Sequence, residues 1–206
     1  MQQTELSGIV CARICHDLGS PIGALVNGVD LIREICPGDA TEELEILERS
    51  ARRAAALLRL HRLAFGAAGD AQAKLARGEL WALAAEVFTR PRVEIACSAP
   101  EGPALDAAVV RLAALLVLAG RAMLGMSGTL RLVLSSSDAL PVAVLVAGPK
   151  AAASPDQRRW LRAGPGPGPD APEVEFALIP AAAEAAGARV ELTEAEGQVA
   201  LRALPP

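Results

Sequence analysis

The chain has 206 residues, enough for one ordinary domain or two small ones around an apolar core. Its net charge of −4 and isoelectric point near 5.3 leave no basic stripe for phosphates, which argues against a nucleic-acid-binding protein. Hydrophobic residues make up 52% of the chain and aromatic residues only 2%. This alanine-rich composition favours closely packed helices over an all-β architecture.

Two features of the sequence predict a protein without a membrane span. The N-terminal stretch MQQTELSG lacks the basic and apolar regions of a signal peptide. The longest apolar run, Leu112 to Gly120, lies between two arginines and is too short to cross a bilayer. We therefore expect a soluble, cytoplasmic protein.

The first 66 residues predict two helices in an antiparallel hairpin. One helix is expected over residues 4–35, ended by the turn Cys36-Pro37-Gly38-Asp39, and a second over residues 40–66. Asp39 and Glu42 have the spacing of a capping box at the start of the second helix. A heptad frame with Cys11 at position a gives the first helix an apolar stripe. The stripe of the second helix consists of Leu44, Leu47, Ala51, Ala54, Leu58, His61 and Phe65.

A hairpin with stripes this wide cannot bury them by itself. Two copies that form a four-helix bundle would do so, and the sequence therefore predicts a homodimer. A monomer that folds the hairpin against its own second domain is the competing solution.

The pattern changes after residues 66–70, which predicts two domains, 1–69 and 70–206. Helices beside a mostly antiparallel sheet are expected in the second domain, so the fold class is α+β. Helices are expected over residues 78–88, 105–123, 155–162 and 173–186, and strands over residues 92–96, 129–134, 142–146, 189–192 and 198–201.

The four cysteines, at positions 11, 15, 36 and 97, do not have zinc-ribbon spacing. Cys11 and Cys15 lie one helical turn apart and His16 follows, so a metal site is one interpretation of this segment. Residue 16 lies about 100° around a helix from residue 15, which is poor geometry for a shared ion. The sequence predicts no metal site and buried, reduced thiols instead.

His16 is the residue with the strongest chemical signal. In the heptad frame it falls at position f, away from the apolar stripe, so its imidazole is expected to project into solvent. The alternative is an ordinary surface histidine. Asp17 can hydrogen-bond one ring nitrogen and raise the nucleophilicity of the other. Pro21 removes a backbone N–H one turn later and should bend the helix. By contrast, His61 lies on the stripe of the second helix and is expected to be structural.

Small residues surround His16 on the same helix face. Ala12, Gly19, Ser20 and Gly23 would leave a flat surface that a partner backbone can approach. Glycine inside a helix costs about 1 kcal/mol relative to alanine, so two glycines here call for a reason. The expected partner-binding residues are Ala12, Arg13, Gly19, Ser20, Gly23 and Asn27.

The segment H-D-x-x-x-P resembles the phosphoacceptor box of bacterial sensor histidine kinases. Two longer blocks are similar to the ChpT-type histidine phosphotransferases of alphaproteobacteria: Cys15-His16-Asp17, Ser20-Pro21-x-Gly23-Ala24 and Asn27-Gly28, and the run Arg62 to Gly69. The resemblance implies a dimeric four-helix bundle with His16 as the phosphoacceptor. It also implies that the second domain is an α/β sandwich resembling a degenerate kinase-type ATPase domain.

Compared with such kinases, the second domain lacks the nucleotide-binding residues. The helix over Leu112–Met123 contains no Asn, Asp or Glu to hold Mg²⁺, and Ala147-Gly148-Pro149-Lys150 replaces the expected adenine-binding aspartate. The alternating Gly-Pro run 164–169 is unsuited to cradling phosphate, since proline has no N–H.

These observations predict a histidine phosphotransferase of a phosphorelay. His16 would accept a phosphoryl group from the receiver domain of a hybrid histidine kinase and pass it to a response regulator. No cofactor is expected on this chain, and Mg²⁺ is expected on the receivers. The alternatives are a dimeric scaffold that is never phosphorylated and an ATP-dependent histidine kinase.

Overall fold

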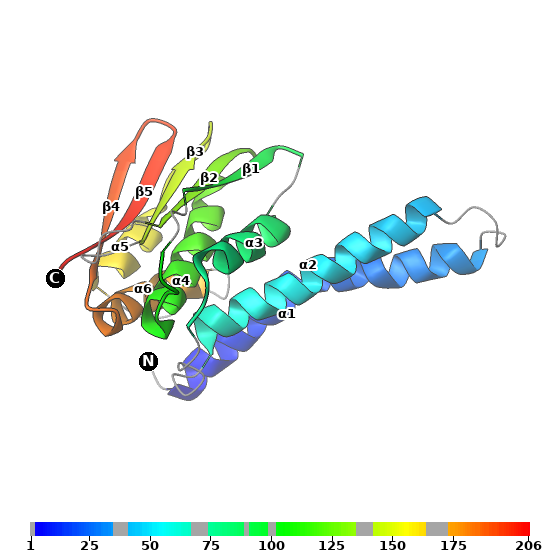
Figure 1. Ribbon diagram of the computed structural model, residues 1–206, viewed down its shortest axis with the longest axis horizontal. Helices are drawn as coiled ribbons and strands as arrows, with labels where there is room; N and C mark the ends of the chain where they lie inside the picture. Colours follow the sequence, from blue (N-terminus) through cyan, green and yellow to red (C-terminus); the bar gives the residue numbers. More distant parts are fainter. Residues whose placement is uncertain are drawn as a thin grey trace.

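The computed structural model describes residues 3–34, 41–66, 74–88, 91–98, 102–134, 142–163 and 173–206. Two long helices, α1 (Gln3–Glu34) and α2 (Thr41–Phe65), form an antiparallel hairpin. One end of the hairpin packs against a mixed α/β unit and the other end projects away from it (Figure 1). Both helices lie within two residues of their predicted bounds. The predicted capping box at Asp39 and Glu42 lies outside the described side chains.

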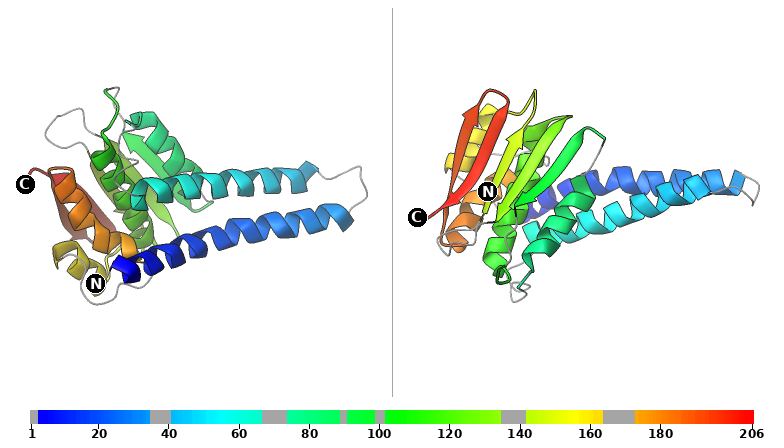
Figure 2. Two further views of the ribbon diagram at one scale, coloured as in Figure 1. Left: turned by 90° about the horizontal axis from the view of Figure 1, so that it is seen from below. Right: turned by 45° about the horizontal axis from the view of Figure 1, so that its top comes forward.

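The α/β unit is a five-stranded sheet with helices on one face. Its strands are β1 (Val93–Ser98), β2 (Gly128–Leu134), β3 (Val142–Ala147), β4 (Arg189–Ala195) and β5 (Gln198–Leu204). The order is β1-β2-β3-β5-β4, with β1 and β2 parallel and every other pair antiparallel. No helix of the described residues covers the opposite face of the sheet (Figure 2). The predicted α+β class is confirmed.

Four helices accompany the sheet: α3 (Arg77–Phe88), α4 (Ala107–Leu124), α5 (Pro155–Ala163) and α6 (Val174–Ala185). Helix α4 lies at the centre of the core, and every residue from Leu112 to Gly120 is buried. Gly120 permits close packing, since a Cβ there would lie 2.5 Å from Val144 Cγ1 of β3. Alternate residues of the strands face the helices, so the period-two pattern of the sequence sets which side chains enter the core.

The core continues from the α/β unit into the hairpin. Leu57, Leu60 and Ala64 of α2 are buried in the same apolar cluster as α3 and α4. We call the hairpin residues 10–21 and 53–65 the proximal end, and residues 22–34 and 41–50 the distal arm. The predicted alternative to a dimer was a hairpin folded against its own second domain. This alternative holds for the proximal end, which packs on the α/β unit of the same chain. The division at residues 69 and 70 lies outside the described residues and stays a prediction.

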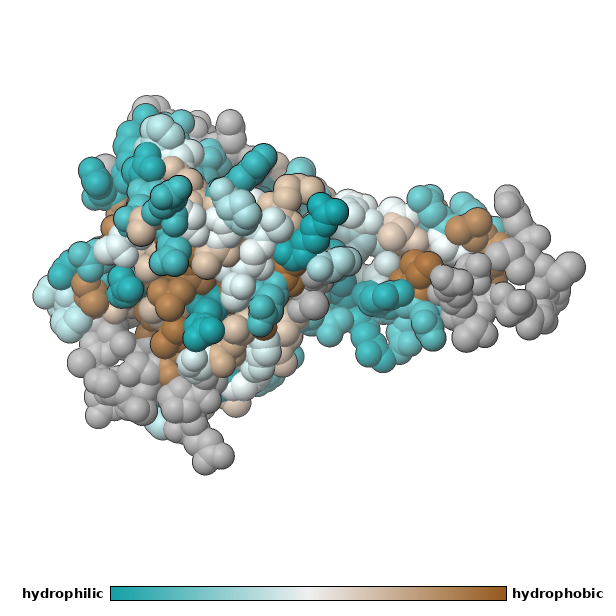
Figure 3. Space-filling model, turned by 90° about the horizontal axis from the view of Figure 1, so that it is seen from above, coloured by the Kyte–Doolittle hydropathy of each residue, from teal (hydrophilic) through white to brown (hydrophobic). Residues whose placement is uncertain are grey.

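The distal arm exposes apolar side chains. They form brown patches on the arm in Figure 3. Its exposed large apolar residues are Ile22, Val26, Val29, Leu31, Leu44 and Ile46, each 42–55% exposed. Within the arm Gly28 packs on Leu47, so the two helices touch each other, but their outer faces do not touch the rest of the described chain.

Two helical segments are long and apolar enough to cross a membrane, Ile9–Ile32 and Ala107–Leu124. The apolar run Leu112 to Gly120 was expected to be too short to cross a bilayer, but the helix that contains it has 18 residues. Buried core helices pass the same test, and 67% of the second segment is buried, against 6% of the first. Length and composition alone therefore do not show that either helix crosses a membrane.

Candidate functional site

The imidazole of His16 projects from the middle of α1 into solvent. Its side chain is 70% exposed, as its heptad position predicts. Nδ1 lies 3.1 Å from Oδ1 of Asp17, the next residue along the helix. Because the carboxylate accepts the proton of Nδ1, the second ring nitrogen, Nε2, keeps its lone pair for a reaction.

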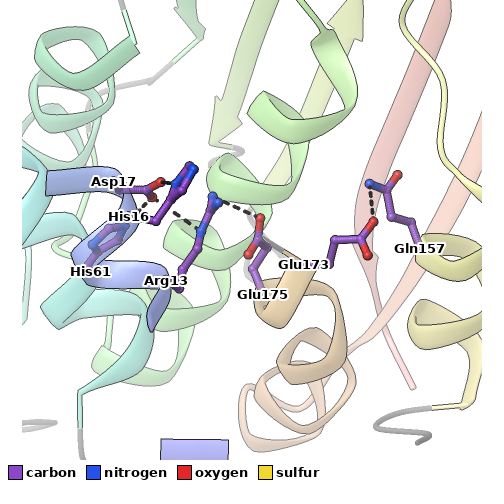
Figure 4. Close-up of polar contacts among 7 residues, drawn as sticks. All are labelled: Arg13, His16, Asp17, His61, Gln157, Glu173 and Glu175. Atoms are coloured by element: carbon purple, nitrogen blue, oxygen red, sulfur yellow. Dashed lines mark hydrogen bonds and ion pairs between the residues drawn. The ribbon is translucent and has the colours of Figure 1, made fainter. Parts of the chain in front are cut away.

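Asp17 connects His16 to α2. Its Oδ2 accepts a hydrogen bond from His61 Nε2 at 3.0 Å and lies 3.4 Å from Arg13 Nε (Figure 4). Burial alone would raise the pKa of Asp17, but the hydrogen bond from His61, the charge of Arg13 and the bond from His16 together hold it below its usual range. Asp17 therefore stays ionised beside the imidazole.

His61 is the residue whose part in the site the sequence did not reveal. It is only 1% exposed and its ring lies 5.5 Å from that of Phe65, centroid to centroid. The structural role predicted for it is confirmed, but its Nε2 also orients Asp17. His61 belongs to the apolar stripe of α2, and such a stripe does not indicate a hydrogen bond to Asp17, which lies 44 residues away on another helix.

A buried carboxylate from the α/β unit completes the polar cluster. Glu175 of α6 is fully buried, and its Oε1 accepts a hydrogen bond of 3.4 Å from Arg13 Nη2 (Figure 4). Burial raises the pKa of Glu175 to about 7, and the charge of Arg13 opposes that rise. A continuous series of polar contacts thus leads from Glu175 through Arg13 and Asp17 to His16.

A cavity of about 210 Å³ opens beside His16, between the hairpin and the α/β unit. It is lined by Arg13, His16, Asp17 and Ser20 of α1, Arg53 and Leu57 of α2, Phe88 of α3 and Arg121 of α4. We call it the arginine cavity. Arg121 Nη1 donates a 2.7 Å hydrogen bond to the carbonyl of Gly125, which fixes the guanidinium at the end of α4.

The predicted partner-binding residues fall into two groups. The exposed ones are Ala12, Gly19, Ser20 and Asn27, with Gly23 half-buried beside them. Arg13 differs, because its side chain is 12% exposed and both Asp17 and Glu175 engage it. The geometry gives Arg13 a contact inside the protein, and its predicted contact with a partner stays a prediction. Pro21 is buried within an uninterrupted α1, and the bend there stays a prediction.

The prediction of buried thiols was wrong for the first two cysteines. Cys11 and Cys15 are exposed, and Cys97 is half-buried. The heptad frame places Cys11 on the stripe, but at this end of α1 its side chain is exposed. Among the described residues, no group of three His, Cys, Asp or Glu side chains is close enough to hold a metal ion.

The comparisons with known proteins agree with this picture. The family described as the histidine phosphotransferase C-terminal domain matches residues 77–198, more than half of the chain. The chain belongs to this histidine phosphotransferase family. Protein phosphotransferase ChpT of Brucella abortus (strain 2308) is 35% identical over 138 residues, which cover 66% of this chain and 64% of that protein. The ChpT-type resemblance seen in the sequence is confirmed.

A solved structure agrees over almost the full length. It is described as the 1.7 Å structure of a bacterial phosphotransferase, and it is 28% identical with a TM-score of 0.78. The match covers 98% of this chain and 97% of that one. The sequence match to the Brucella phosphotransferase, by contrast, spans a little less than two thirds of that protein's length.

Proposed function

We propose that this histidine phosphotransferase carries a phosphoryl group on His16 between the aspartates of two receiver domains. The donor receiver would belong to a hybrid histidine kinase and the acceptor to a response regulator, in the cytoplasm. The observation that carries the proposal is the exposed imidazole whose Nδ1 is engaged by Asp17. The sequence contains two histidines, and the other, His61, is buried.

In the proposed reaction Nε2 of His16 attacks the phosphorus of an aspartyl phosphate. The N–P bond forms while the P–O bond to the donor breaks, and the electron pair of that bond leaves on the donor carboxylate. The imidazole becomes a cation that keeps its proton on Nδ1, where Asp17 balances the charge. Transfer to the second receiver reverses these steps. Such reactions depend mainly on positioning and charge neutralisation.

The receivers are proposed to supply the Mg²⁺ that this transfer needs. The carboxylate nearest to His16 is Asp17, and it is already engaged by His16, His61 and Arg13. A hard cation needs several oxygen ligands, and one carboxylate surrounded by hydrogen-bond donors is a poor basis for such a site. No cofactor is therefore proposed for this chain.

We also propose that the α/β unit no longer binds ATP. Three observations support this. Helix α4 carries no Asn, Asp or Glu, and its residues from Leu112 to Gly120 are packed in the core. The end of β3 and the turn after it, Ala147 to Lys150, offer no carboxylate for an adenine. The unit would then be a degenerate kinase-type domain that supports the hairpin and its partners.

A second copy of the chain is proposed to cover the distal arm. The arm exposes six large apolar side chains, among them Val26 and Leu44. An apolar groove of about 650 Å³ continues along the outer side of the hairpin between Val10 and Phe65. Two antiparallel hairpins packed on these surfaces would make the predicted four-helix bundle.

The proposed function is tested by incubating the protein with a phosphorylated receiver domain and, separately, with radiolabelled ATP. Wild type and His16→Ala are compared. We expect acid-labile label from the receiver only, and only in wild type. His16→Ala should leave the oligomeric state unchanged, because the exposed side chain packs against little.

Other outcomes would identify the alternatives. Label from ATP would make the protein a kinase and contradict the proposal for the α/β unit. No label from either donor would favour the scaffold. Label that persists in His16→Ala would mean that another residue accepts the phosphoryl group. His61 is the one other histidine of the chain.

A further inference from the structure

The arginine cavity gathers positive charge next to the reactive histidine. Three guanidinium groups line it, from Arg13, Arg53 and Arg121, against the single carboxylate of Asp17. Arg13 already faces two carboxylates, Asp17 and Glu175. The other two guanidinium groups come from α2 and α4, which are elements that do not carry His16.

The walls of the cavity make these charges effective. Leu57 and Phe88 are buried and close the cavity on the side of the core. Apolar walls lower the local dielectric constant, so a charge there interacts more strongly with an ion than it would in water. The bond from Arg121 to the Gly125 carbonyl also holds one guanidinium in place before any ligand arrives.

We propose that the arginine cavity is a phosphoryl-binding site, in which Arg53 and Arg121 hold the oxygens of the phosphoryl group that enters or leaves Nε2 of His16. The inference rests on the proposed function of His16 and assigns two further residues to it. Guanidinium groups suit this task because their planar N–H groups match the geometry of phosphate oxygens.

The two arginines would act on the charge that the group carries during transfer. When the N–P bond forms and the P–O bond to the donor breaks, three phosphoryl oxygens keep their negative charge. Fixed cations aimed at these oxygens stabilise the transition state without reorganising solvent. Because Arg121 belongs to α4, the α/β unit would contribute directly to transfer and would not only support the hairpin.

The same arginines could instead bind acidic side chains of a receiver surface. A phosphoryl donor without a protein separates these two possibilities. Phosphoramidate is such a donor: its P–N bond breaks, ammonia leaves, and the phosphorus becomes bonded to the imidazole nitrogen. A phosphoryl-binding site should speed this reaction, whereas a receiver-docking site should not affect it.

The experiment measures the rate of His16 phosphorylation by phosphoramidate in the full chain, followed by ³¹P NMR. Arg53→Gln and Arg121→Gln are compared with wild type, and Arg52→Gln serves as the matched control. Arg52 neighbours Arg53 on α2 but is 65% exposed and pairs with Glu48 outside the cavity. Each variant in the cavity is expected to react at least about tenfold more slowly, the lower limit of the loss expected for one charged hydrogen-bond donor.

Three further measurements separate binding from misfolding. Arg53→Lys and Arg121→Lys keep the charge and should recover part of the rate. Thermal unfolding of each variant shows whether a slow variant is still folded. Titration of unphosphorylated wild type with inorganic phosphate should shift the NMR signals of the His16 ring, and this shift should weaken in both glutamine variants.

The outcomes also distinguish this inference from the proposed function. If wild type is phosphorylated on His16 and the folded glutamine variants react as fast as Arg52→Gln, the cavity does not bind the phosphoryl group, while His16 remains the acceptor. If only transfer from a receiver slows, the arginines bind the partner and the inference is wrong. If His16 of wild type accepts no phosphoryl group from either donor, the proposed function itself fails.

Discussion

The proximal end and the distal arm are two parts of the same pair of helices with opposite surroundings. At the proximal end α2 buries Leu57, Leu60 and Ala64 against the α/β unit. In the distal arm comparable apolar side chains such as Val26 and Leu44 are about half exposed. One chain therefore buries one side of the proximal end of the hairpin against its own α/β unit and leaves the apolar side chains of the distal arm exposed.

The polar cluster follows the same division. Arg13, Asp17, His61 and Glu175 all lie at the proximal end or beneath it, where the α/β unit excludes water. His16 contacts this cluster through Asp17, while its side chain stays 70% exposed. The difference is consistent with the two proposals made above, in which the proximal end holds the acceptor histidine and the distal arm joins two copies.

Val26→Glu is expected to have the largest effect, on the association of the distal arms. In a symmetric dimer each copy loses an apolar contact of at least ~1.5 kcal/mol, so the dissociation constant should rise about 100-fold or more. Sedimentation velocity over a dilution series measures this change. Gln198→Glu, which adds the same charge on exposed β5, is the control. A wild type that stays monomeric at high concentration would contradict the proposed dimer.

Glu175→Gln tests the buried contact beneath the proximal end. Because the folded pKa of Glu175, about 7, lies above its ordinary 4.5, its contribution to stability is full below pH 4.5 and is lost as pH rises through 7. At about 1.4 kcal/mol per pH unit, the loss approaches ~3 kcal/mol. Asp17, whose pKa is lowered, behaves oppositely: its contribution is lost in acid.

Urea unfolding from pH 5 to pH 8 measures the effect. Wild type should lose stability as pH rises, and Glu175→Gln should flatten that slope. Glu184→Gln changes an exposed carboxylate of the same helix and should keep the wild-type slope. Equal slopes in all three proteins would mean that Glu175 ionises normally.

Asp17→Asn is expected to slow transfer from a phosphorylated receiver about 10–100-fold, the usual cost of losing a group that orients a reactive histidine. The amide is neutral, so it cannot balance the imidazolium that forms when Nε2 takes the phosphoryl group. Rapid-quench single-turnover measurements give the rate, and Asp30→Asn on the same helix is the control. If the rate stays within twofold of wild type, Asp17 does not assist His16.

The sequence predicts local features well and long-range ones poorly. Apolar periodicity predicts the helix bounds within two residues, and the exposure of His16 follows from its place in the heptad frame. The last two strands, β4 and β5, each extend three residues beyond their predicted ends. The contact between Arg13 and Glu175 joins residues 162 positions apart, and nothing in either helix indicates it. Glu175 has the position of an ordinary acidic residue in the first turn of a helix. Its burial depends on how α6 packs against α1.

Glycine substitutions give the smallest effect and compare the two regions within one helix. A Cβ at Gly19, at the proximal end, would meet no atom within 4 Å. At Gly28, in the distal arm, it would lie 2.6 Å from Leu47 Cδ2. Alanine is a better helix former than glycine by up to ~1 kcal/mol. Gly19→Ala should therefore stabilise the fold by nearly this amount, while Gly28→Ala should gain less because Leu47 has to move.

The two variants should also differ in function. Gly19 lies on the exposed face beside His16 where a receiver is predicted to approach, so its new methyl group should weaken receiver binding although the protein is more stable. Gly28→Ala should leave receiver binding unchanged. Urea unfolding and titration with an unphosphorylated receiver measure the two effects. If Gly19→Ala binds the receiver as wild type does, the flat surface around His16 is not needed for close approach, and the glycine there serves another purpose.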